Sequence, residues 1–123
     1  MNGDRSFKFV LGIALAAAAV ACSGGGGSAG GASADGKKLF VAKGCTACHV
    51  APGIPEAVGT IGPSLAGVAS RPTIAGGKLQ TSAENVKTWL KDPPAVKSDT
   101  QMPKLQISDA EIEALTQLML SFK

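Results

Sequence analysis

The sequence predicts an all-α domain with three main helices. Two stretches, 81–84 and 108–111, open with Thr or Ser and place a Glu three residues later, which is the capping-box pattern of helix starts. Apolar residues then recur at helical spacing, and little strand pattern is present. With 123 residues and a Gly-rich first third, the chain can build one small core at most.

The first predicted helix runs from about Asp35 to Lys43, and Gly44 ends it. Gly36 and Phe40 share one face of this helix. A Gly on a helix face lets another helix approach closely. The third predicted helix starts at Ser108 and should therefore pack across the first at Gly36 through an apolar stripe of Ile112, Leu115, Met119 and Phe122.

The second predicted helix begins with the 81–84 capping box and ends at the Asp-Pro-Pro sequence 92–94. Val86, Trp89 and Leu90 form its apolar side, so we expect Trp89 to point inward.

The charge pattern excludes nucleic acid as a partner. The formal net charge is +3, of which Arg5, Lys8 and Asp4 at the N-terminus supply one unit. The lysines are spread along the chain one or two at a time, without a basic cluster interleaved with aromatic residues, which make up only 4%.

The N-terminus has the pattern of an export signal. Arg5 and Lys8 precede an apolar run over 9–21 that would span roughly 20 Å as a helix, short of the ~30 Å of a bilayer core. We therefore predict a signal peptide over 1–21 that is cleaved before Cys22. The alternative is a plain secretory signal that leaves Cys22 as a free thiol.

Residues 19–22, Ala-Val-Ala-Cys, resemble the lipobox of bacterial lipoproteins, which implies that Cys22 is lipidated. Residues 22–34 then form a flexible Gly/Ser/Ala tether, and 35–123 the folded domain. We expect an exported, lipid-anchored protein on the periplasmic or cell-surface side of a bacterial membrane.

The central motif is Cys-Thr-Ala-Cys-His at 45–49, the C-x-x-C-H pattern of covalent haem c attachment. The thiols of Cys45 and Cys48 can add to one haem edge, and His49 can reach the iron. Zinc would need four ligands, whereas the chain has one His and no second Cys pair. A thioredoxin-like dithiol lacks the surrounding βαβ pattern. A single His also limits the chain to one haem.

Met102 lies between Gln101 and Pro103, in a segment without helical periodicity, and its thioether suits haem iron as the second ligand. The alternative is that Met102 only fills core space, as we expect of Met119. Trp89 is a further candidate, because its indole N–H could donate to a haem propionate.

Taken together, residues 35–123 resemble a class I cytochrome c. In that family a Gly and an aromatic residue on the first helix precede C-x-x-C-H, and a Gly-Pro-x-Leu element follows, here at 62–65. The resemblance implies a small cytochrome c fold in which the Pro63 carbonyl accepts from His49 Nδ1 and Leu65 packs on the haem. It also implies that Arg71 binds a propionate, unless Arg71 is only a solvated loop residue.

Residues 73–105 are similar to the cytochrome c domain of haem-copper oxidase subunit II. The sequence given lacks that subunit's copper domain and transmembrane hairpin, so we expect a stand-alone electron carrier that is not an enzyme. Its donor would be a quinol:cytochrome c oxidoreductase and its acceptor a terminal oxidase or another reductase. Lys43, Lys97 and Lys104 could dock an acidic partner.

Two alternatives stay open from the sequence. A haem enzyme or gas sensor would have an open sixth position in place of Met102. A permanently docked cytochrome subunit of a larger redox complex would have the same domain and tether.

Overall fold

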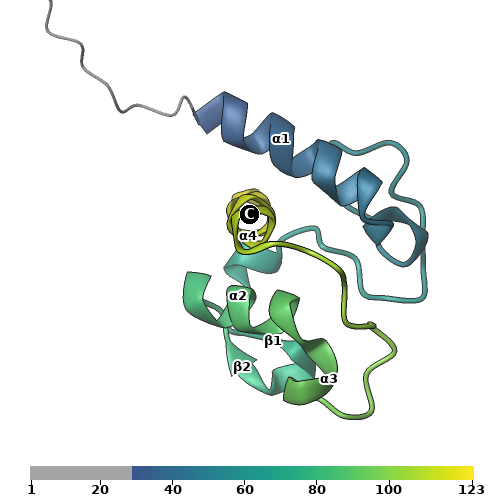
Figure 1. The fold of residues 1–123 in the computed structure, drawn as a ribbon, viewed down its shortest axis with the longest axis vertical. Helices are drawn as coiled ribbons and strands as arrows, with labels where there is room; N and C mark the ends of the chain where they lie inside the picture. The colour runs from purple at the N-terminus through teal and green to yellow at the C-terminus, as the bar shows by residue number, and fades with distance from the viewer. Residues whose placement is uncertain (1–28) are drawn as a thin grey trace, which may run out of the picture.

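The computed structural model describes residues 29–123, and its secondary structure is mostly helical (Figure 1). The helices are α1 (Ala29–Ala42), α2 (Ala83–Lys91), α3 (Pro93–Val96) and α4 (Asp109–Ser121), with short 3-10 turns at Cys45–Ala47, Val68–Ser70 and Ala75–Gly77. Two-residue strands β1 (Thr73–Ile74) and β2 (Leu79–Gln80) pair antiparallel in the one small sheet of this part of the chain. The predicted all-α class is confirmed.

The predicted signal peptide and Cys22 lie outside the described residues. Among residues 29–123, no helix is both long enough and apolar enough to cross a membrane.

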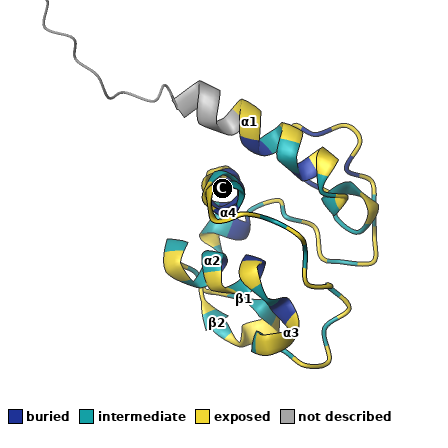
Figure 2. Cartoon of the chain, viewed as in Figure 1, coloured by how far each residue is buried: buried dark blue, intermediate teal, exposed yellow. Residues whose placement is uncertain are grey.

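The crossing of α1 and α4 forms the centre of the core, and Figure 1 shows α4 end-on beneath α1. A Cβ added to Gly36 would lie 3.0 Å from both the Ala114 carbonyl oxygen and Leu118 Cβ. Phe40 and Leu118 are 2% and 0% exposed. Figure 2 shows buried segments, in dark blue, on both α1 and α4. The predicted close approach at Gly36 is therefore confirmed, because a side chain at this position would push the helices apart.

The start of α4 also follows the prediction. Ser108 is its N-cap and accepts from the Glu111 backbone N–H, while the Glu111 side chain accepts from the Ser108 N–H. This complete capping box satisfies two of the donors that a helix start leaves free.

The start of α2 differs from the prediction, because the 81–84 capping box does not form. Ser82 is the N-cap and accepts from the Asn85 backbone N–H, and the Asn85 side chain donates to the Gln80 carbonyl. Thr81 instead donates its N–H to the Pro72 carbonyl at 3.0 Å. This bond makes Thr81 part of the hairpin formed by β1 and β2, so the N-cap of α2 lies one residue later than the capping box predicted.

Trp89 does not belong to the core, contrary to our expectation. The buried residues of α2 are Val86 and Leu90, at 4% and 7% exposure, whereas Trp89 is half-buried. Val86 and Leu90 are four residues apart and share one face, which turns Trp89 toward the edge of that face.

α1 begins at Ala29, six residues before the predicted start, so part of the stretch predicted as coil is helical. The Gly and Ser content of this stretch suggested a tether, but its alanines favour helix and continue the helix that packs on α4.

Candidate haem site

The two cysteines of the 45–49 motif lie on one short turn. Gly44 adopts a left-handed conformation (φ 78°) that ends α1 and directs the chain into the 3-10 turn Cys45–Ala47. The backbone N–H groups of Cys48 and His49 both donate to the Cys45 carbonyl, at 3.2 and 3.0 Å. Both thiols are free and half-buried, and burial raises the pKa of the Cys45 thiol. The turn therefore holds both thiols within four consecutive residues.

The imidazole of His49 is held by one short contact. Its Nδ1 lies 2.8 Å from the Pro63 carbonyl oxygen, which is the contact that the Gly-Pro-x-Leu resemblance implied. A carbonyl can only accept, so Nδ1 carries the hydrogen and Nε2 has its lone pair free for a metal. Such a bond fixes the tautomer and ring orientation and raises the basicity of the ligand nitrogen.

The loop 50–65 packs its backbone against the attachment turn. Gly59 N–H donates to the Thr46 carbonyl at 3.1 Å, and Gly62 N–H donates to the Cys48 carbonyl at 2.7 Å. A Cβ on Gly59 would overlap the peptide between residues 47 and 48, and one on Gly62 would overlap the His49 ring. Only glycine fits at either position.

Sequence reasoning did not single out these two glycines as site residues. The available signal was a pair of glycines three residues apart, 10 and 13 residues after His49 and outside any helical pattern. Glycine in such a place often marks a close approach of backbone to a functional group.

Met102 lies in the extended segment between α3 and α4, and its side chain is half-buried. It packs against the same core cluster as Cys45 and Leu65. Figure 1 shows the segment returning on the same side of α4 as the loop that follows the attachment turn. The fold thus packs Met102 against the cluster that Cys45 also contacts.

Arg71 has partners that the sequence did not reveal. Its Nη2 donates to the carbonyls of Ser64 and Ala66, at 2.7 and 2.8 Å. The guanidinium therefore ties together the short stretch that begins directly after Pro63.

The three lysines expected to dock a partner each have an internal ion pair. Lys43 pairs with Glu111, Lys97 with Asp99 and Lys104 with Asp92, at 3.0, 2.8 and 2.8 Å. Neighbouring carboxylates partly offset these charges, and docking of an acidic partner by the three lysines stays a prediction.

These residues fit a covalently bound haem. Two free thiols on one turn are followed by an imidazole whose Nε2 is available, and the apolar side chains of Leu65 and Met102 belong to the same cluster. Within residues 29–123, no three His, Cys, Asp or Glu side chains gather as they would around a zinc ion.

Comparison with known proteins gives three similar relatives, each named cytochrome c oxidase subunit 2. The proteins from Bacillus subtilis (strain 168), Alkalihalophilus pseudofirmus and Bacillus sp. (strain PS3) are 39%, 32% and 33% identical over 94, 89 and 93 residues. Each alignment covers 72% of this chain but only 26%, 25% and 26% of the relative. The chain thus spans about a quarter of the length of these relatives.

These names correct one prediction from the sequence. We expected the chain not to be an enzyme, but its relatives are named as subunits of an oxidase, which is an enzyme complex. The chain is therefore related to a component of an enzyme complex.

A family comparison covers nearly all of the described domain. Residues 33–123 match the family described as Cytochrome c, and the match includes the 45–49 motif, Met102 and α4. Covalently bound haem c and a role in electron transfer follow from this match and from the relatives, as the resemblance implied. This chain belongs to the cytochrome c family.

Proposed function

We propose that this protein is a membrane-tethered cytochrome that carries single electrons through one haem c ligated by His49 and Met102. The observation that supports this most strongly is the 2.8 Å contact between His49 Nδ1 and the Pro63 carbonyl. A histidine that only filled space would need no such partner, whereas a metal-ligating histidine commonly has one.

Each protein group has a separate task in this proposal. The thiols of Cys45 and Cys48 hold the haem, and Pro63 orients the imidazole of His49. When bound, the haem supplies an iron that changes oxidation state by one electron. Met102 supplies a soft thioether, which raises the reduction potential relative to a second imidazole. With His49 and Met102 both bound to the iron, no position would be left for a substrate or a gas, so the site would only exchange electrons.

The proposed cellular setting rests on the N-terminal sequence and on the relatives. A signal peptide over 1–21 and lipidation of Cys22 would anchor the domain on the exported side of a bacterial membrane. The relatives' name supports an oxidase of a respiratory chain as the acceptor. We propose a quinol:cytochrome c oxidoreductase as the donor, and a terminal oxidase or another reductase of a respiratory or photosynthetic chain as the acceptor.

The ligation is tested by visible spectra of the oxidised and reduced protein. We expect the wild type to show the weak far-red band of Met–Fe(III) ligation and to ignore CO when reduced. Met102→Leu keeps the side-chain volume but removes the sulfur, so the band should disappear and CO should bind. The matched control is Met119→Leu on α4, which should keep the band because Met119 is an 8% exposed core residue.

A band that survives in Met102→Leu would exclude Met102 as the ligand. A wild type that binds CO readily would have an open sixth position, and a gas sensor or haem enzyme would then be the better proposal.

Arg71 can either hold the loop through its two carbonyl contacts or act as a counter-charge to a haem propionate, and two substitutions distinguish these roles. Arg71→Lys keeps the positive charge, but the lysine ammonium ends one bond short of the Nη2 that donates to both the Ser64 and the Ala66 carbonyls. We expect the free energy of unfolding to fall by about 1–2 kcal/mol, as for lost hydrogen bonds from a charged donor. Denaturant titration measures this. If Arg71 acted only as a counter-charge to a propionate, Arg71→Lys would match the wild type and only Arg71→Ala would be destabilised.

A further inference from the structure

The segment that carries Met102 is fastened to the rest of the domain by few polar contacts. Residues 101–107 form neither helix nor strand, and the Met102 N–H bonds only to nearby Thr100. Within the described residues, the hydrogen bonds that join this segment to other elements come from two lysines. Lys104 donates to Asp92, and Lys43 donates to the Gln106 carbonyl at 3.2 Å.

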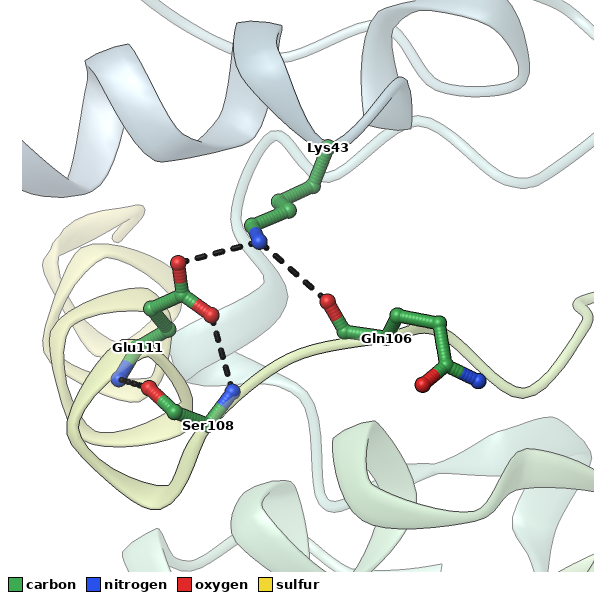
Figure 3. A network of polar contacts seen from close by, with 4 residues as sticks. All are labelled: Lys43, Gln106, Ser108 and Glu111. Atoms are coloured by element: carbon green, nitrogen blue, oxygen red, sulfur yellow. Dashed lines mark hydrogen bonds and ion pairs between the residues drawn. The ribbon is translucent and has the colours of Figure 1, made fainter.

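Lys43 links three parts of the fold, as Figure 3 shows. It follows α1 directly, and its backbone N–H donates to the Leu39 carbonyl at 2.8 Å. Its Nζ lies 3.2 Å from the Gln106 carbonyl and 3.0 Å from Glu111 Oε1 on α4. The ammonium thus joins the end of α1 to the Met102 segment and to the start of α4.

Glu111 holds this ammonium in a fixed place. Its second oxygen accepts from the Ser108 N–H at 2.8 Å, so the capping box fixes the carboxylate. The Ser108 N–H and then the Lys43 ammonium lower the pKa of Glu111, which keeps the carboxylate ionised.

Of the two lysines that bond to this segment, Lys43 is the less exposed to water. The side chains of Lys43 and Glu111 are 27% and 28% exposed, whereas Lys104 is 60% exposed. Exposed ion pairs contribute little because water screens them. A partly buried ammonium that also donates to a carbonyl contributes more.

We propose that Lys43 is a positioning residue for Met102, and that its bond to the Gln106 carbonyl restrains the segment 101–107 so that the thioether stays at the haem. This inference rests on the proposed ligation by Met102. Glu111 aims the ammonium, and the segment opens more often when the ammonium is removed.

Imidazole binding to the oxidised, haem-loaded full-length protein measures this opening, because imidazole can replace Met102 only when the segment moves away. We expect Lys43→Ala to raise the imidazole association constant about fivefold, the effect of losing roughly one ordinary hydrogen bond. Lys43→Arg retains a donor of similar reach and should stay within about twofold of the wild type. Glu111→Gln keeps the cap acceptor but loses the charge, so its value should lie between these two.

The matched control is Lys87→Ala. Lys87 pairs with Glu113 between α2 and α4 and is 35% exposed. Its removal changes the net charge by the same amount as Lys43→Ala but takes no hydrogen bond from the segment 101–107. We expect imidazole binding within about twofold of the wild type. Equal increases in Lys43→Ala and Lys87→Ala would show general loosening and overturn the proposal, as would no increase in Lys43→Ala.

The Met102→Leu variant in the same titration separates this inference from the proposed function. It should bind imidazole far more tightly than any lysine variant. A wild type that already binds as tightly as Met102→Leu, without a far-red band, would overturn both the ligation and the role of Lys43. A wild type with the band and weak imidazole binding leaves the comparison of Lys43→Ala and Lys87→Ala to decide the inference alone.

Discussion

Gly62→Ala is expected to lower the free energy of unfolding of the haem-bearing protein by about 3 kcal/mol, the upper range for overpacking a tight site. The added Cβ would lie within 3.0 Å of three atoms of the His49 ring. The Gly62 backbone cannot move away easily, because its N–H donates to the Cys48 carbonyl. The ring must then rotate away from Pro63. Denaturant unfolding measures the stability, and the visible spectrum should show weakened axial ligation.

Gly67→Ala is the control for losing a glycine. Gly67 has a positive φ of 70°, but no atom lies within 4 Å of an added Cβ. Only backbone strain of about 1 kcal/mol is expected, and the spectrum should stay unchanged. If both variants lose the same stability and keep wild-type spectra, the contact between Gly62 and the His49 ring has no role in ligation.

Leu118→Ala is expected to destabilise the domain by about 3–4 kcal/mol, as for a buried leucine whose cavity cannot collapse. Leu118 is 0% exposed, and its Cβ lies where Gly36 brings α1 against α4. Both helices are fixed at that point, so the space stays empty. A thermal or denaturant scan measures the loss.

Leu120→Ala is the matched control on the same helix, because Leu120 is only half-buried. We expect a loss of roughly 1–2 kcal/mol, in proportion to the smaller apolar area removed from water. Equal losses at residues 118 and 120 would contradict a core centred on the helix crossing.

The features that the sequence predicted correctly depend on residues that are close together in the chain, or on a glycine that leaves space on a helix face. The capping box of Ser108 and Glu111 is local, and it forms as expected. Gly36 has no side chain on a helix face, which left a close crossing as its natural role. The 45–49 motif contains its own spacing, so its two thiols and its imidazole could be identified without the fold.

The parts that were missed depend on competition between elements. Thr81 and Ser82 could each cap α2, and the hairpin decides between them by taking the Thr81 N–H. The partners of Lys43 and Arg71 lie far along the chain or on a backbone carbonyl, which no side-chain pattern reveals. Local composition also misled at 29–34, where the continuation of a packed helix outweighs the cost of glycine.

The length of α1 has a consequence for electron exchange. Fourteen residues in a helix rise about 21 Å, and Cys45 follows three residues after the C-terminal end. The helix therefore acts as a rigid spacer of about two nanometres between its own first residue and the attachment turn. Tunnelling rates fall steeply over such a distance. A redox group fixed beside the first residue of α1 would therefore be a poor electron donor to a cofactor held at the attachment turn.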